Sequence, residues 1–335
     1  MSTVSAYPTH VKPWARRFFI TREMGIIYLL LAAIILSSVF VNKFFQGATI
    51  YYLCLDILPS LLIALPMTMV MITGDIDISV GSMLGLSCSL LGLLYSLGVP
   101  YELGMVAALS IGLLGGLLNG LLVTKINLPA LAVTIGTLAL FRGISVGLLG
   151  TKAVTNFPER WTNFAKMRIP GTDFPVPILI FVALLVVFVI LLHFTTFGRG
   201  VYAIGLNKEA AVFSGVNEGR TRTILFVLAG GMAALSGIFY TMRYGTARGD
   251  AGEGLELQVI AAIVLGGVSV FGGRGAMHGA VAGVVVIGVL SAALRLLGVA
   301  SDVIKIITGT LLILSVVVGA LLIWIGNRRV PKTAL

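Results

Sequence analysis

Long apolar runs recur along almost the whole chain, and short polar turns separate them. A helix needs about 20 residues to cross a hydrocarbon core of ~30 Å, and most of these runs reach or approach that length. The pattern therefore predicts an all-α integral membrane protein with about ten transmembrane helices. The runs are Gly25–Val41, Thr49–Thr73, Val80–Leu97, Gly104–Thr124, Leu128–Gly150, Pro175–Phe194, Thr223–Arg243, Leu257–Phe271, Ala276–Gly298 and Ile304–Ile325.

Composition agrees with this pattern and indicates a single transmembrane domain over residues 1–335. The chain is 58% hydrophobic and 11% charged, whereas a soluble domain carries about 25% charged residues. Three polar segments interrupt the apolar pattern: an N-terminal segment (1–24) and two longer loops (151–174 and 195–222).

The basic residues predict the orientation in the membrane. The net charge is +10, and three basic clusters flank apolar runs. The positive-inside rule places these clusters in the cytoplasm, with both termini inside, 195–222 cytoplasmic and 151–174 periplasmic. Four bases in 151–174 argue against this orientation. Because the charge flanks membrane segments, no nucleic-acid partner is expected. The clusters are Lys12, Arg16, Arg17 and Arg22; Arg199, Lys208, Arg220 and Arg222; and Arg328, Arg329 and Lys332.

Two aspartates interrupt the apolar pattern in the segment Thr73–Gly85, TGDIDISVGSMLG. A carboxylate near hydrocarbon costs roughly 2.5–3.5 kcal/mol, so each needs a reason. Asp77, with Ser79, either lies near a solute path or caps the following helix, and the capping role is favoured. Asp75 is expected to face water or a partner.

Three further polar residues lie in apolar helices and complete the candidate path or gate. They are Asn119, Thr134 and Thr137. Such residues more often form hydrogen bonds between helices than bind a ligand. Pro59 and Pro66 indicate either a broken helix leading into the aspartate segment or a plain kink.

Glycines spaced by four predict close helix packing, and a gate or dimer seam is the alternative. One such series is Gly112, Gly116 and Gly120, and another is Gly275, Gly279 and Gly283. A faint repeat, GxMxG, joins Gly81 and Gly85 to Gly275 and Gly279.

The chain lacks the common signatures of catalysis. No G-x-x-x-x-G-K-[ST] or HExxH sequence occurs, and the three histidines are far apart along the chain. No metal site or cofactor is expected in this chain, and no nucleophile and base converge in the sequence. Energy for any transport must come from an ion gradient or from a partner.

The loop 195–222 contains Glu209-Ala210-Ala211 followed by Gly215, the pattern EAAxxxG. Ala and Glu favour a helix, and Gly215 can end it. Such a short helix would dock into a groove on a cytoplasmic protein, or it would lie on the membrane surface.

This EAAxxxG pattern resembles the coupling loop of ATP-binding cassette (ABC) importer permeases, although the proline that usually follows is absent. Thr73–Ser82 resembles the TGGIDLSVGS of ribose-type sugar permeases, with Asp75 in place of the usual glycine. Further similar segments occur in the family's order: Leu128–Thr137, Phe141–Gly143, Phe197–Gly205, Ile260–Gly267 and Gly272–Gly275.

The resemblance implies an inner-membrane permease subunit that imports a sugar or sugar-like solute by alternating access. It further implies a second permease subunit, a periplasmic sugar-binding protein, and a cytoplasmic ATPase that binds the ATP and Mg²⁺. Glu209, Ala210, Ala211 and Gly215 would couple to that ATPase. The aromatic stretch Phe157–Phe174 would dock the binding protein or anchor the chain at the membrane interface.

Two other functions remain open on the sequence. An ion-coupled secondary transporter would use Asp75 and Asp77 as ion ligands. A permease of similar architecture could instead carry branched-chain amino acids or nucleosides.

Overall fold

The computed structural model describes residues 22–328, and helices dominate this part of the chain. Each of the ten apolar runs contains one helix, so the predicted all-α membrane architecture is confirmed. The helices are α2 (Arg22–Phe40), α3 (Gly47–Ile72), α4 (Val80–Ser96), α5 (Tyr101–Thr124), α6 (Ala130–Leu149), α7 (Glu159–Lys166), α8 (Pro177–His193), α9 (Thr196–Leu206), α10 (Lys208–Phe213), α11 (Glu218–Tyr244), α12 (Leu255–Leu265), α13 (Met277–Leu296) and α14 (Ser301–Arg328); β1 (Val154–Thr155) and β2 (Thr246–Ala247) form one antiparallel pair.

The predicted number of ten spans is not confirmed. Within the described residues, five helices are long and apolar enough to cross a membrane, or six if α8 and α9 form one bent span. The runs assigned to α4 and α12 gave only shorter apolar helices. The basic residues before Arg22 and after Arg328, on which the predicted location of the termini depends, lie outside the described residues.

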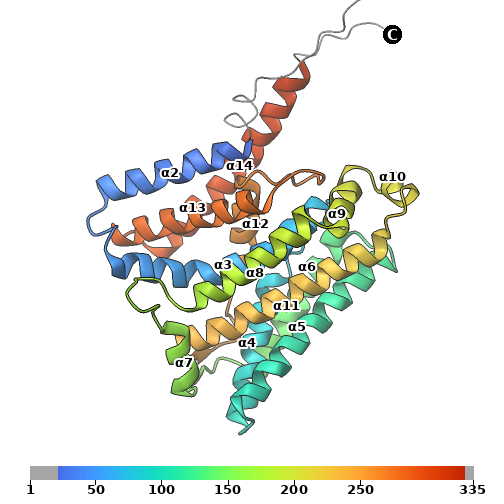
Figure 1. Ribbon diagram of the computed structural model, residues 1–335. Helices are drawn as coiled ribbons and strands as arrows, with labels where there is room; N and C mark the ends of the chain where they lie inside the picture. The colour runs from blue at the N-terminus through green and yellow to red at the C-terminus, as the bar shows by residue number, and fades with distance from the viewer. Residues whose placement is uncertain (1–21, 329–335) are drawn as a thin grey trace, which may run out of the picture.

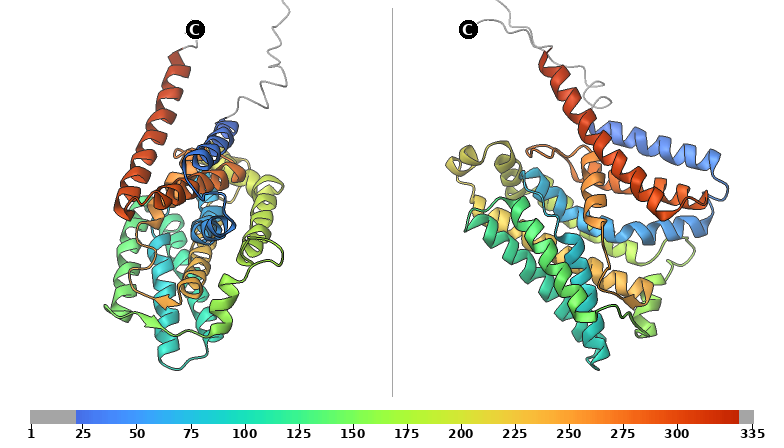
Figure 2. Two further views of the ribbon diagram at one scale, coloured as in Figure 1. Left: turned by 90° about the vertical axis from the view of Figure 1, so that its left-hand side faces the viewer. Right: turned by 180° about the vertical axis from the view of Figure 1, so that it is seen from behind.

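The bundle has two ends, named here by the short helices that mark them. The α10 end carries α9, α10 and the start of α11, and the α7 end carries α7 and the end of α11 (Figure 1). Helices α4, α5 and α6 lie on one side of the bundle, and α2, α13 and α14 lie on the other (Figure 2). α3 contacts α8, α11, α12 and α13. Almost all residues in its most apolar part are buried inside the protein.

α3 continues through both of its prolines, Pro59 and Pro66. Of the two alternatives that the sequence offered at these prolines, the broken helix is therefore not found. The Ser236 hydroxyl of α11 donates to the Pro59 carbonyl over 3.1 Å, so α11 contacts the backbone of α3 at this proline. The bend lies elsewhere, where α8 and α9 meet at 64°.

The glycines of α5 let α11 approach closely. A methyl group on Gly112 would lie 2.6 Å from the Gly230 carbonyl oxygen, and one on Gly116 would overlap the Phe226 carbonyl oxygen. The glycines of α13 behave alike, because a methyl group on Gly283 would overlap the Ala262 carbonyl oxygen of α12, and one on Gly279 would overlap that of Gly266, directly after α12. Both series therefore lie at contacts inside the chain.

The loop 151–174 forms a folded cover at the α7 end. It contains the amphipathic helix α7, and β1 pairs with β2. Phe157 is buried against Tyr95 and Tyr101, and the Trp161 indole donates to Glu102 over 2.8 Å. Phe157 therefore serves internal packing and is not available to a docking partner.

Candidate functional site

The turn between α3 and α4, Thr73–Ser79, is joined to α11 by a buried ion pair. Asp75 is 5% exposed, and its two carboxylate oxygens accept from Arg222 Nε at 2.6 Å and Nη2 at 2.7 Å. The expectation that Asp75 faces water or a partner is wrong. The reason is the guanidinium, whose planar fork matches both oxygens and compensates the cost of burying the carboxylate.

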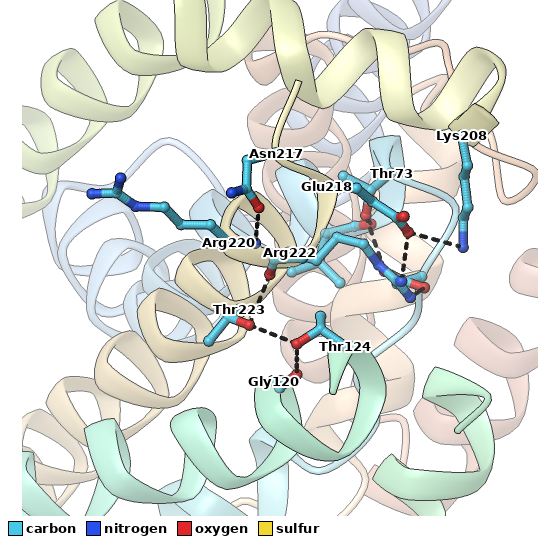
Figure 3. A network of polar contacts seen from close by, with 12 residues as sticks. Thr73, Gly120, Thr124, Lys208, Asn217, Glu218, Arg220, Arg222 and Thr223 are labelled. Atoms are coloured by element: carbon cyan, nitrogen blue, oxygen red, sulfur yellow. Dashed lines mark hydrogen bonds and ion pairs between the residues drawn. The ribbon is translucent and has the colours of Figure 1, made fainter. Parts of the chain in front are cut away.

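The ion pair continues outward to the short helix α10 (Figure 3). Arg222 Nη1 donates to Glu218 one helical turn earlier, over 2.8 Å, and Glu218 lies 3.9 Å from Lys208 Nζ. Asp75, Lys208, Glu218 and Arg222 together form the α10-end cluster. Its two acids and two bases balance, so the cluster carries no net charge.

A second polar cluster holds the other half of the turn. Asp77 Oδ1 accepts from the Ser79 amide at 2.9 Å and from the Ser79 hydroxyl at 2.6 Å, and Asn119 donates to that hydroxyl over 2.9 Å. Burial raises the pKa of the Asp77 carboxyl, although the hydrogen bonds from Ser79 act in the opposite direction.

The remaining candidates for the path or gate differ in their contacts. The Thr134 hydroxyl donates to the Ile76 carbonyl over 3.2 Å, so α6 also holds the turn. Thr137 bonds within its own helix, to Val133 over 3.1 Å. Four of the five candidates, all except Thr137, therefore fix the turn between α3 and α4 and tie it to α5 and α6.

Glycines bring other backbones against this turn. The Gly273 amide donates to the Ile72 carbonyl over 2.8 Å, and Gly205 lies so close that a methyl group there would overlap Ile72. Gly74 has a φ of +85°, a conformation that L side chains rarely adopt. The turn is therefore where α9 and the chain between α12 and α13 meet α3.

The EAAxxxG segment forms the predicted short helix at the α10 end. The Asn207 side chain caps α10 by accepting from the Ala210 amide over 2.9 Å, and Gly215 follows the helix with a φ of +85°. Ala211 is buried, while Glu209 and Ala210 are exposed. Phe213, at the end of α10, is 92% exposed.

A cleft of about 410 Å³ lies beside α10, between α9 and the start of α11. Its lining combines apolar, hydroxyl and basic side chains, and the residues are Thr196, Phe197, Gly200, Ser214, Gly215, Val216, Asn217, Arg220, Thr221 and Ile224. The surface at this end therefore offers both a protruding helix and an adjacent depression.

A further ion cluster lies near the α7 end, and no sequence pattern singled it out. Asp56 of α3 accepts from Arg243 of α11 at 2.6 Å and from Arg295 of α13 at 3.0 Å. These three residues form the α7-end cluster. They lie far apart along the chain in separate apolar runs, so only the fold brings them together.

Gly81 and Gly85, predicted for helix packing, face the irregular segment before α12. A methyl group on Gly85 would lie 2.7 Å from both the Ala251 carbonyl oxygen and Arg142 Nη1. Arg142 of α6 itself donates to the carbonyls of Gly249 and Ala251 over 2.9 and 2.8 Å. The repeat partner Gly275 precedes α13 with a φ of +143°.

Among the described residues, no group of three or more side chains could hold a metal ion.

The comparisons with known proteins are consistent with this arrangement. The profile of the family described as "Branched-chain amino acid transport system / permease component" matches residues 49–325. The chain belongs to this permease family. It is 36% identical over 253 residues to "Autoinducer 2 import system permease protein LsrD" of Escherichia coli K12, E. coli O157:H7 and Shigella flexneri, covering 74% of each chain. No solved structure matches the chain.

The resemblance drawn from the motifs is thereby confirmed. The chain is a multi-pass permease subunit of an ABC importer of the inner membrane, a transport component and not an enzyme. A permease of this class works with an ATPase and a substrate-binding partner.

Proposed function

We propose that this permease imports a sugar or a sugar-like solute, with a second permease subunit completing the pathway. The support is the 36% identity over 253 residues to relatives named for autoinducer-2 import. The two aspartates of the turn do not favour ion coupling, because Asp75 is already paired with Arg222 and Asp77 is hydrogen-bonded to Ser79. The ATPase would supply ATP and Mg²⁺ binding, and a periplasmic protein would deliver the solute.

We further propose that the α10 end faces the cytoplasm and that the ATPase binds there. Glu209, Ala210, Ala211 and Gly215 would couple the two subunits. The support is geometric: α10 protrudes, its terminal Phe213 is almost wholly exposed, and the cleft lies beside it. An apolar side chain so exposed at a charged end of the bundle is suited to a groove on another protein.

Asp77, Ser79, Asn119 and Thr134 are assigned to a gate rather than to solute binding. Ser79 donates to Asp77, Asn119 donates to Ser79, and Thr134 donates to the Ile76 carbonyl, so these bonds fix the backbone between α3 and α4. Among the described residues the buried Asn119 Oδ1 has no hydrogen-bond partner. Thr137 bonds within α6 and stays a candidate for the path.

Uptake in the native host tests the substrate class and the energy source. Cells that lack this gene would be compared with complemented cells, using labelled autoinducer-2, D-ribose and L-leucine. We expect complementation to restore autoinducer-2 or ribose uptake. We expect the uptake rate to stay unchanged when the proton gradient is dissipated at constant cellular ATP, and to fall when ATP is depleted. Restored leucine uptake would support the branched-chain rival, and collapse with the gradient would support a secondary transporter.

Two variants test the coupling role of α10. Glu209→Gln and Gly215→Val should let the ATPase hydrolyse ATP without uptake, while the complex still assembles. Asp302→Asn is the matched control, because Asp302 is an exposed acid in the first turn of α14 and lies in neither proposed docking segment. Unchanged uptake in both α10 variants would contradict the role.

A further inference from the structure

We propose that the Asp75–Arg222 ion pair is the positioning element that transmits a displacement of α10 to the turn Thr73–Ser79. The inference deepens the proposed function and rests on it, because the displacement is caused by the ATPase. It assigns a role to a pair that joins two segments 147 residues apart in the sequence.

The first step of the argument is that α10 is fastened to the start of α11. The Val216 amide donates to the Ala211 carbonyl over 3.0 Å, and Asn217 caps α11 by accepting from the Arg220 amide over 2.9 Å. Lys208 and Glu218 add a charge contact across the connection. A push on α10 is therefore carried to the first turn of α11.

The second step is that Arg222 connects this turn of α11 to the interior. It holds Glu218 with one nitrogen and Asp75 with two others, and its side chain is 9% exposed. Two parallel hydrogen bonds from a planar guanidinium fix orientation as well as distance. Because water has little access, it cannot replace the pair when α11 moves.

The third step is that the turn is a meeting point of several helices. Asn119 of α5 and Thr134 of α6 bond to it, and the Gly273 amide bonds to Ile72 directly before it. A displacement of Asp75 would therefore be felt by α3, α4, α5 and α6 at once. Within the described part of the chain, Arg222 is the cation that pairs with this turn.

The competing explanation is that the pair only stabilises the fold. The α7-end cluster provides the matched comparison, because Asp56–Arg243 also joins α3 to α11 at 2.6 Å but touches neither α10 nor the turn. A purely structural role would make Asp75→Asn and Asp56→Asn alike. A transmitting role would separate them.

The experiment is amide hydrogen exchange on the native complex, purified through a tag on this chain together with its ATPase. Exchange is measured with and without ATP plus orthovanadate, for the peptides covering 73–79 and 208–218. In the wild type we expect nucleotide to change exchange several-fold in both segments. In Asp75→Asn the change should persist in 208–218 and be lost in 73–79, whereas Asp56→Asn should keep both.

Arg222→Lys is the second variant, since it keeps the charge but removes the fork, and we expect an intermediate response at 73–79. A nucleotide response at 73–79 that survives in Asp75→Asn, or that is absent from the wild type while 208–218 responds, would overturn the inference alone. A wild-type complex in which 208–218 does not respond would overturn the proposed docking at α10, and the inference with it.

Discussion

The two ion clusters join the same pair of elements, α3 and α11, yet they differ in burial and in what they contact. At the α10 end, Arg222 and Asp75 are 9% and 5% exposed and the chain of charges reaches α10. At the α7 end, Asp56 is 22% exposed and is shared by two arginines: Arg243 is almost as buried as Arg222, at 10%, whereas Arg295 is 49% exposed. The first cluster is positioned to respond to a partner, and the second is positioned to hold α11 in place.

Charge balance sharpens the contrast. The α10-end cluster has equal numbers of acids and bases, whereas the α7-end cluster has one acid and two bases. Part of the excess positive charge faces aromatic rings, since the Arg243 guanidinium lies 5.9 Å from the centroid of Tyr52 and 5.3 Å from that of Tyr244. The α10-end cluster thus depends on each charge having its partner. The α7-end cluster tolerates one excess positive charge, because Arg295 is partly exposed to solvent.

The largest expected effect comes from removing the buried cation at the α10 end. Arg222→Met leaves the Asp75 carboxylate buried without a cation, with only the Thr73 hydroxyl donating to it over 3.3 Å. Breaking a buried ion pair in this way costs about 3–5 kcal/mol. We expect a marked loss of thermal stability of the detergent-purified protein, followed by size-exclusion after heating. A loss no greater than that of Arg295→Met would remove the distinction between the two clusters.

The helix that connects the clusters is tested next. Gly116→Leu would force α5 away from α11, where a side chain has no room, and overpacking of this kind costs about 1–3 kcal/mol. Gly136→Leu on α6 is the control, because nothing lies within 4 Å of its added carbon. The heating assay should separate the two variants. Equal stability would mean that the α5–α11 contact does not keep α11 in place.

At the α7 end, the two arginines should be unequal. Arg243→Met removes a mostly buried pair, since Arg243 and Asp56 are 10% and 22% exposed, but Asp56 keeps Arg295, so we expect a loss of about 1–2 kcal/mol. Arg295→Met removes an exposed partner and should cost less than about 1 kcal/mol. The same assay ranks them, and the reverse order would show that the exposed arginine carries the cluster.

The smallest effect is expected for Lys208→Ala at the outer edge of the α10-end cluster. The contact with Glu218 is long, at 3.9 Å, and half of the Lys208 side chain is exposed. An exposed pair contributes less than about 1 kcal/mol and is screened by salt. Unfolding in low and high salt should show a small difference that disappears at high salt. A large, salt-independent loss would place Lys208 inside the buried part of the cluster.

The sequence predicted the helical architecture well, because an apolar run of about 20 residues indicates a helix by its length and composition alone. It also predicted α10, since Glu, Ala and a following glycine have strong local preferences. The family resemblance depended on short segments that the fold keeps near one another, such as Thr73–Ser82 and Gly272–Gly275.

The ion clusters could not be predicted in the same way. Asp75 and Arg222 were each noticed, but one was expected to face water and the other to flank the membrane. A periodic pattern shows which face of a helix is buried, but it does not show which distant side chain lies opposite. Asp56 and Arg243 were missed for the same reason. A lone charge inside an apolar run was the available signal, and it indicates the need for a partner without naming it.

The number of ATP molecules hydrolysed per solute imported tests the central claim most directly. It would be measured for the native complex in proteoliposomes, with the solute identified by the uptake assay. We predict that Asp75→Asn raises this ratio several-fold while Asp56→Asn leaves it at the wild-type value, even if both variants lower the amount of folded complex. An unchanged ratio in Asp75→Asn, or an equal rise in both variants, would contradict the role of the Asp75–Arg222 pair in transmitting the displacement of α10.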